Sequence, residues 1–123
     1  MYNNDLDSIG QGQSSGFLTI PATNTNAYKD LCSLTIPSDG TYLINAHLQV
    51  DKNLPDKFLV GMLVSNNTVI INNRGTANNG GGFNLVYVSY FHDQPSIKLR
   101  VYDNFDINVN YECILTVTKL SNK

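Results

Sequence analysis

The hydrophobic and polar positions of this chain alternate with a period of two residues over most of its length. Residues 41–50 show the pattern most clearly, directly after a turn signal at 37–40. The apolar set there is Tyr42, Ile44, Ala46, Leu48 and Val50, and the opposite set is Leu43, Asn45, His47 and Gln49. A period of two with one apolar face indicates a half-buried antiparallel strand.

Further extended segments follow at short intervals, separated by Pro, Gly, Asn and Asp. The expected strands are residues 16–21, 28–36, 41–50, 58–64, 68–72, 83–91, 96–102, 107–110 and 111–120. Short strands at this spacing predict an all-β fold, specifically a jelly-roll β-sandwich of about eight to ten antiparallel strands. Residues 1–16 are polar and predict a flexible N-terminal arm or linker. Residues 17–123 are expected to form a single jelly-roll domain.

The composition is low in charge and rich in amides. Lys, Arg, Asp and Glu make up 15% of the 123 residues, against about 25% in ordinary domains, and the formal net charge is −2. The chain has 17 Asn and no run of Lys or Arg, so we expect no nucleic-acid binding. Amides, hydroxyls and rings can instead pack against copies of the chain or bind a neutral sugar, although an AT-rich genome also enriches Asn codons. No signal peptide is visible, and no apolar run predicts membrane insertion.

The two cysteines, Cys32 and Cys113, lie 81 positions apart and both fall inside expected strands. Neither has a His or Cys neighbour at the spacing of a zinc site. Two interpretations follow from the residues. The thiols are buried side chains of the core, or they form a bridge between the first and last core strands.

The sequence contains no catalytic motif, so we expect no enzyme activity, no cofactor and no metal. The two histidines, His47 and His92, have no nucleophile beside them, and no serine lies in a nucleophile elbow. Residues 103–106 offer oxygen ligands for Ca²⁺ but lack the fixed spacing of a calcium loop. A catalytic carboxylate pair would have to assemble in space from Asp51, Asp56, Asp93 or Asp103.

Five stretches occur in an order known from one family of β-sandwiches. They are residues 34–42, which read Leu-Thr-Ile-Pro-Ser-Asp-Gly-Thr-Tyr, and residues 58–71, 82–91, 96–101 and 111–117. This order resembles the C1q/TNF-like trimeric jelly roll, in a form similar to its bacterial and phage members. The resemblance covers about the last hundred residues, and it implies a threefold homotrimer.

The two-sided apolar pattern of two strands gives independent support for a trimer. Leu43 adds to the second face of residues 41–50, and Val86, Val88 and Tyr90 add to that of residues 83–91. One face fills the sandwich core, and the other is covered either by symmetric partners or by loops of a monomer. The aromatic residues that we expect at the trimer interface are Tyr42, Tyr87, Tyr90, Phe91 and Tyr111.

Loops are the expected functional surface, because rigid strands hold them in place. The segment 72–82 is long and rich in Asn and Gly. It is either a disordered crossover or, with 51–57 or 92–95, part of a recognition surface, and we expect recognition for the domain as a whole. The candidate ligand-binding residues are Asn73, Arg74, Asn78, Asn79, Asp51, Lys52, His92 and Asp93. We expect a non-enzymatic trimeric head of a virion or extracellular surface fibre that binds a cell-surface glycan or protein receptor. The alternatives are a purely structural decoration or trimerisation module and a small carboxylate-dependent enzyme.

Overall fold

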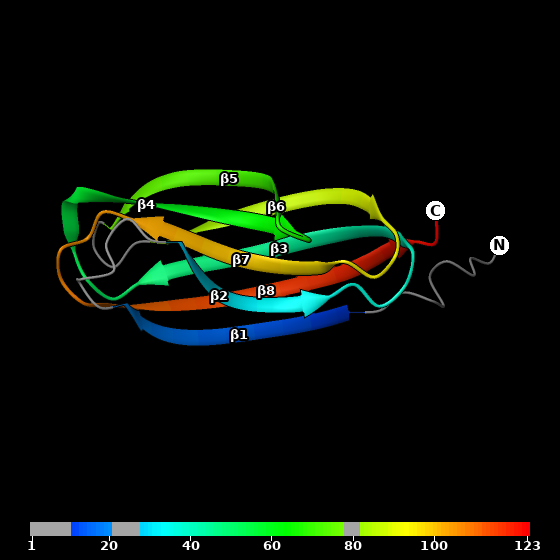
Figure 1. The fold of residues 1–123 in the computed structure, drawn as a ribbon, viewed down its shortest axis with the longest axis horizontal. Helices are drawn as coiled ribbons and strands as arrows, with labels where there is room; N and C mark the ends of the chain where they lie inside the picture. Colours follow the sequence, from blue (N-terminus) through cyan, green and yellow to red (C-terminus); the bar gives the residue numbers. More distant parts are fainter. Residues whose placement is uncertain (1–10, 21–27, 78–81) are drawn as a thin grey trace.

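Every regular element in the described part of the protein is a β-strand. The computed structural model describes residues 11–20, 28–77 and 82–123, and Figure 1 shows long strands that follow the longest axis of the molecule. The strands are β1 (Gln11–Ile20), β2 (Lys29–Thr35), β3 (Gly40–Val50), β4 (Leu54–Ser65), β5 (Thr68–Ala77), β6 (Gly82–Phe91), β7 (Ser96–Asp103) and β8 (Val109–Ser121). Among these residues there is no helix with the length and apolar character needed to span a membrane. The expected all-β class is confirmed.

The strands form two four-stranded antiparallel sheets. Sheet A has the order β1-β8-β3-β6, and sheet B has the order β2-β7-β4-β5. Apart from the β4–β5 hairpin, consecutive strands lie in opposite sheets, so the chain passes repeatedly between the two layers (Figure 1). Two sheets interleaved in this way form an eight-stranded jelly roll, as the sequence predicts.

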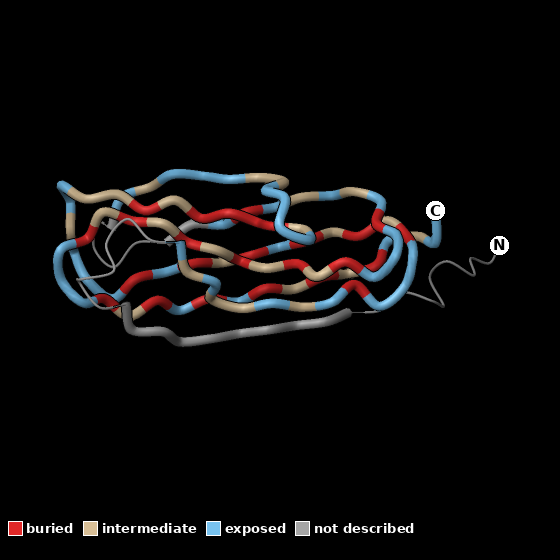
Figure 2. The backbone as a smooth tube through the Cα atoms, viewed as in Figure 1, coloured by how far each residue is buried: buried red, intermediate tan, exposed pale blue. Residues whose placement is uncertain are grey.

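The hydrophobic core lies between the inner faces of the two sheets. Buried and more exposed residues alternate along β3, β7 and β8, as Figure 2 shows. The five alternate residues of β3 that the sequence assigns to an apolar face are all buried, and so are Ile97, Leu99 and Val101 of β7. In these strands the period-two pattern correctly predicts which face points inward.

β4 is the strand whose buried face the pattern does not predict. Alternation groups Phe58, Val60, Met62 and Val64 on one apolar face, but Leu59 and Leu63 are the β4 residues of the core cluster, and Met62 and Val64 are buried as well. Both faces of this strand are apolar, so alternation alone cannot say which face is buried. Phe58 and Val60 lie on the outer face of sheet B and are only partly covered.

Three strands extend at one end by at least four residues beyond the predicted bounds. β1 begins at Gln11, so residues 11–15 pair with β8 instead of belonging to a flexible arm, and the rest of the expected arm lies outside the described residues. β4 begins at Leu54 and accommodates Pro55, which has no N–H to donate, through a shift in pairing register. β5 continues to Ala77, into a segment expected to be an open loop. Backbone pairing needs no apolar side-chain pattern, and polar residues can therefore extend these strands.

The two ends of the sandwich carry different loops. β1 begins and β8 ends at one end, which we call the terminal end, because Gln11 pairs with Thr118. Figure 1 shows this end at the right, and the opposite end, which we call the distal end, at the left. The turns 36–39, 66–67 and 92–95 lie at the terminal end, and the loops 51–53 and 104–108 lie at the distal end.

Candidate functional site

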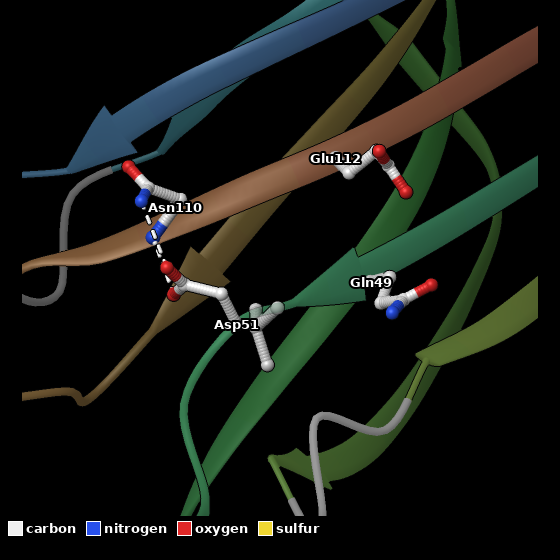
Figure 3. A pocket seen from close by; sticks show the side chains of 5 residues that line it. Gln49, Asp51, Asn110 and Glu112 are labelled. Carbon is white, nitrogen blue, oxygen red and sulfur yellow. Dashed lines mark hydrogen bonds between the residues drawn. The ribbon is translucent and has the colours of Figure 1, made fainter.

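A hollow at the distal end of sheet A lies where β3 ends and β8 begins. Both carboxylate oxygens of Asp51 accept hydrogen bonds from Asn110, one from its backbone N at 2.9 Å and one from Nδ2 at 2.8 Å. The cross-strand neighbours Gln49 and Glu112 line the next part of the hollow (Figure 3). Its volume is about 130 Å³, below the roughly 300–1,000 Å³ of ordinary ligand pockets. The hollow offers polar groups but little enclosure.

Asp51 connects β3 to β8 and has a structural role. Its N–H donates to the Asn110 carbonyl at 3.2 Å, in addition to the two bonds that its carboxylate accepts. The backbone N–H of Asn110 stabilises the charged carboxylate and so holds the pKa of Asp51 below its ordinary value. Asp51 is a sequence-predicted ligand residue, but its oxygens are engaged within the fold. Lys52, the next candidate, is exposed.

The acidic residue that closes β7 is buried and paired. Asp103 is 3% exposed, and its carboxylate accepts hydrogen bonds from the Tyr111 hydroxyl at 2.5 Å and from the Phe105 backbone N at 2.9 Å. Burial raises the pKa of the Tyr111 hydroxyl well above its ordinary value, and the hydrogen bond to Asp103 raises it further. The Asp103–Tyr111 pair therefore stabilises the distal end of the core.

The other polar residues considered for calcium binding also contact the fold. The Asn104 side-chain oxygen accepts a hydrogen bond from the Phe58 backbone N at 2.8 Å, and Asp106 pairs with Lys57 at 3.5 Å. Nowhere in the described ranges do three or more His, Cys, Asp or Glu residues gather in a group that could hold a metal ion. The structure thus gives these oxygens roles in loop packing.

His92 and Asp93 lie at the terminal end, beside a second hollow of about 280 Å³. His92 Nδ1 and Asp93 Oδ2 are 2.8 Å apart at the surface, and the Tyr90 ring stacks on His92 with centroids 6.3 Å apart. The Asp93 N–H donates to Asp39 Oδ1 at 3.1 Å, which ties this turn to the one before β3. These two candidates are therefore at the opposite end of the molecule from Asp51.

The remaining ligand candidates belong to β5 or to the segment after it. Asn73 and Arg74 are exposed, and they lie on a strand instead of a loop. Asn78 and Asn79 lie outside the described residues. Among the candidates that the structure describes, Asp51 and Lys52 lie at the distal end, His92 and Asp93 at the terminal end, and Asn73 and Arg74 on β5.

Three aromatic rings form a row across the outer face of sheet B, close to the distal end. Tyr28 precedes β2, Tyr102 lies on β7 and Phe58 lies on β4, and these are successive strands of the sheet. The ring centroids of Tyr28 and Tyr102 are 5.2 Å apart, and those of Tyr102 and Phe58 are 6.0 Å apart. These spacings are close to the strand separation of about 4.8 Å. We call Tyr28, Tyr102 and Phe58 the ring row.

Arg74 extends the ring row onto β5, the edge strand of sheet B. Its guanidinium carbon lies 4.1 Å from the centroid of the Phe58 ring, which is the geometry of a cation–π contact. None of the carboxylates in the described ranges forms an ion pair with Arg74. Arg74 is a sequence-predicted candidate, but the rings beside it could not be found without the strand order, because they come from separate strands.

The outer face of sheet B also concentrates positive charge. Lys98 and Arg100 alternate with the buried residues of β7 and so face outward with Arg74. Asp30 pairs with both, at 2.6 Å from Arg100 and 3.7 Å from Lys98. The hydrogen bond from Arg100 is the main reason that the pKa of Asp30 lies below its ordinary value. Asp30 thus pairs with two of these three cations, and exposed Asp56 and the Lys57–Asp106 ion pair lie at the start of β4 beside Phe58, in a chain with a formal net charge of −2.

The outer face of sheet A carries an apolar cluster along β6 and its neighbour β3, beside polar residues such as Asn45 and His47. Val86 and Val88 of β6 are each 53% exposed, and Tyr90 is 48% exposed. Leu43 of β3 pairs with Val88, and Ile114 and Leu120 of β8 add further exposed apolar surface. A contiguous exposed apolar patch commonly marks an interaction surface.

The aromatic residues expected at the trimer interface separate into two groups. Tyr42, Phe91 and Tyr111 are 0%, 7% and 0% exposed, and they belong to the core. Tyr87 also points inward and is partly buried against the core. These four occupy the inner positions of their alternating strands, so the expectation is corrected for the three buried residues, which offer no surface to a partner. Tyr90 lies on the outer face of sheet A.

Cys32 and Cys113 lie close together between the two sheets. Their Sγ atoms are 3.0 Å apart, and Cys113 is 1% exposed. Cys32 belongs to β2 of sheet B and Cys113 to β8 of sheet A. The two thiols are neighbours across the core, an arrangement that both interpretations of the sequence allow.

The strand order makes this protein a jelly-roll β-sandwich, and solved structures share the fold. The infectious bursal disease virus VP2 subviral particle aligns with 94% of this chain at 16% identity and a TM-score of 0.63. The PRD1 vertex protein P5 aligns with 88% of this chain and 73% of its own, at 12% identity and a TM-score of 0.60. Dimeric latent PorU from Porphyromonas gingivalis aligns with 92% of this chain and 13% of its own, at 11% identity and a TM-score of 0.58.

These likenesses show the fold alone, because the sequences are so different. The chain spans about a third of the length of the infectious bursal disease virus chains that it matches, covering 33% and 34% of two of them. No protein-family model matches the sequence, and no curated protein matches it.

Proposed function

We propose that this chain is a head domain of a virion or surface fibre, which forms a homotrimer through the outer face of sheet A and binds a cell-surface receptor at its distal end. The observation that carries the proposal is the apolar outer face of sheet A, with Val86, Val88 and Tyr90 about half exposed. Removing such surface from water is favourable by about 25 cal/mol per Å². A closed symmetric oligomer covers the face on every subunit at once.

The sequence and the fold neighbours support this proposal from two directions. Residues 34–42 and four later stretches resemble C1q/TNF-like domains, a resemblance that implies trimers. The similar solved structures include a subviral particle and a vertex protein by name. Placing this chain on a virion or an extracellular surface is an inference from that shared fold.

The arrangement of the two ends supports outward presentation of the distal loops. β1 begins and β8 ends at the terminal end, so a stalk or particle joined there leaves the distal end exposed. Three sites held on one rigid head raise the overall avidity without any new contact at a single site. The proposed recognition is therefore multivalent.

The enzyme alternative requires two carboxylates that share a cleft. Asp51 and Asp103 are hydrogen-bonded to Asn110 and Tyr111, Asp56 is exposed on β4, and Asp93 lies at the other end of the sandwich. Glu112 shares a hollow with Asp51, but that hollow is small and open, and the Asp51 carboxylate is already bonded to Asn110. This distribution supports a binding or structural role over carboxylate chemistry.

Sedimentation equilibrium of the purified chain tests the proposed trimer. We expect a mass about three times the 13.6 kDa of one chain. Val88→Asp places a charge on the apolar face and should shift the mass to that of a monomer. Val69→Asp is the matched control, because Val69 is 45% exposed on the edge strand of the opposite sheet. A monomeric wild-type chain, or equal effects of the two variants, would contradict the proposal.

A host-cell binding assay tests the proposed recognition. The labelled trimer should bind cells saturably, and the Val88→Asp monomer should bind more weakly. The second candidate function is purely architectural, and the particle and vertex names of the fold neighbours favour it. A trimer that binds neither cells nor glycans would support that second function.

A further inference from the structure

We propose that the ring row and Arg74 form a binding platform for an oligosaccharide that carries a carboxylate. The inference rests on the proposed role of the distal end in recognition, and it names a ligand class and the surface that binds it. This surface lies on sheet B, so it leaves the outer face of sheet A available for the trimer contact.

The ring row supplies the apolar part of such a site. Tyr28 is 63% exposed, and Tyr102 and Phe58 are partly exposed on the neighbouring strands. The ring planes meet at 33° and 44° at centroid spacings of 5.2 and 6.0 Å, so neighbouring rings partly overlap, and Tyr28 at the end of the row has the largest exposed surface. Pyranose rings have apolar C–H faces that pack on aromatic rings, and tyrosine adds a rigid contact with a polar edge. The row crosses three strands, so successive sugars of a linear chain can contact successive rings.

Arg74 supplies the charged part of the site. Its cation–π contact with Phe58, with 4.1 Å from the guanidinium carbon to the ring centroid, places the guanidinium beside the ring row. The planar N–H groups of arginine match a carboxylate and can bind it through two parallel hydrogen bonds. The exposed amide of Asn72, two residues earlier on the same face of β5, can donate to and accept from sugar hydroxyls.

The charge of the surrounding surface favours an acidic ligand. Lys98 and Arg100 lie on the same face as Arg74, and Asp30 is the carboxylate that pairs with both. A surplus of positive charge on one face of a chain whose net charge is −2 attracts anionic ligands to that face. A neutral oligosaccharide would gain the stacking without this electrostatic contribution.

An array of matched oligosaccharides tests the proposal with the native protein. The array should contain sialylated and uronic-acid oligosaccharides, each beside its neutral counterpart. We expect binding to a carboxylated probe and weaker binding to its neutral counterpart. Calorimetric titration of the best pair should show that Tyr28→Ala weakens both affinities about tenfold, through loss of the ring contact. Tyr28→Phe should retain most of the binding, because it keeps the ring.

Arg74→Gln separates the charged contribution from the apolar one. It should remove the preference for the carboxylated probe while leaving the affinity for the neutral counterpart nearly unchanged. Thr35→Ala, at an exposed position at the terminal end of β2, should change neither affinity. Tyr102→Ala provides a second test of the ring row, with circular dichroism to show that the fold is retained.

The results also distinguish this inference from the proposed function. A trimer that binds cells but none of the arrayed oligosaccharides would overturn the platform and leave the proposed trimeric head unaffected. An acidic peptide or protein would then be the ligand class to test. Glycan binding that survives Tyr28→Ala and Arg74→Gln would also overturn the platform, because recognition would lie elsewhere. A third outcome is a wild-type chain that sediments as a monomer, binds acidic glycans and loses this binding in the two variants. That outcome would support the platform and contradict the trimer.

Discussion

At the scale of single residues, the buried charged groups of the described chain are located at the two ends of the core. Asp103 accepts a hydrogen bond from Tyr111 at the distal end. Lys119 is 4% exposed near the terminal end, where its Nζ donates to Ser38 Oγ at 2.9 Å and lies 6.0 Å from the Tyr42 ring. Both side chains occupy inner positions of strands, where loss of hydration lowers the stability of the fold unless a hydrogen-bond partner compensates for it. The partners therefore determine whether the ends of the sandwich are stable.

Removing the Tyr111 hydroxyl tests the distal pair. Tyr111→Phe keeps the ring in the core but leaves the buried Asp103 with one hydrogen-bond donor fewer. We expect a loss of about 1–3 kcal/mol in the free energy of unfolding, measured by urea denaturation. Tyr28→Phe is the control, because Tyr28 is 63% exposed and lies away from the proposed trimer face, and its effect should stay within about 0.5 kcal/mol. Equal effects of the two variants would contradict a role for the buried pair.

The raised pKa of Tyr111 predicts loss of stability in alkali. The folded state favours the neutral hydroxyl, whereas the hydroxyl in the unfolded chain ionises near its ordinary pKa of about 10. The stabilisation is therefore fully present below about pH 10 and decreases as the pH rises above it. Urea denaturation at a series of pH values should show this decrease for the wild type and a smaller one for Tyr111→Phe. If the free energy of unfolding of the wild type and of Tyr111→Phe fell in parallel as the pH rose, groups other than Tyr111 would be responsible.

Gly40 is the residue where backbone geometry most restricts the sequence. Its φ is +155°, and a Cβ placed there would lie 2.6 Å from Lys119 Cε and press against the Ser121 carbonyl oxygen. Gly40→Ala should therefore lower the free energy of unfolding by at least about 1–3 kcal/mol. Ser33→Ala, at an exposed position of β2, is expected to change it by less than about 0.5 kcal/mol. If Gly40→Ala left the free energy of unfolding unchanged, the turn before β3 would be able to shift and accommodate a Cβ, which would contradict the prediction.

At the scale of the strands, the sequence predicts a buried face only where one face is apolar and the other is not. β7 satisfies this condition, because Ile97, Leu99 and Val101 alternate with charged and aromatic residues. β4 does not satisfy it, since Leu59 and Leu63 alternate with Phe58, Val60 and Met62, and the choice between the two sets depends on the partner sheet. The same limit applies to β1, where pairing with β8 extends into residues 11–15 that have no apolar pattern.

The contact between β2 and β8 predicts a bridge under oxidising conditions. The Cys32 and Cys113 Sγ atoms are 3.0 Å apart, and a disulfide requires about 2.05 Å, so a small shift would bring them to bonding distance. We expect glutathione disulfide to take two electrons and two protons from the pair, forming one S–S bond and two glutathione molecules. Intact-mass spectrometry should show a chain lighter by two hydrogen atoms. The bridged chain should gain about 2–4 kcal/mol in its free energy of unfolding.

Cys113→Ser is the control for the bridge. Under the same oxidant, the mass of this variant should not change, except where glutathione is added to Cys32. Its free energy of unfolding should not increase. A wild-type chain that stays reduced, even at the urea midpoint where Cys113 becomes accessible, would contradict the prediction.

At the scale of the whole molecule, the candidate site depends on strand order, which the sequence does not specify. Tyr28, Phe58, Arg74 and Tyr102 come from four segments, and the order β2-β7-β4-β5 makes them neighbours. Arg74 alone was accessible to sequence reasoning, because it stands in a stretch of low apolar content. The jelly-roll class could be predicted from the rhythm of short strands, whereas a site that crosses four strands could not.

The two proposed surfaces lie on opposite sheets, so their contributions to binding should separate. Val88→Asp acts on the outer face of sheet A and leaves the ring row intact. We expect the resulting monomer to keep the wild-type affinity for a soluble carboxylated oligosaccharide, measured by calorimetry. Its apparent affinity for a cell surface that displays the same glycan should fall about 10²–10⁴-fold, because multivalency is lost without any change at the single site. Val69→Asp should retain both affinities, and loss of the soluble affinity in Val88→Asp would show that the platform needs residues from a neighbouring subunit.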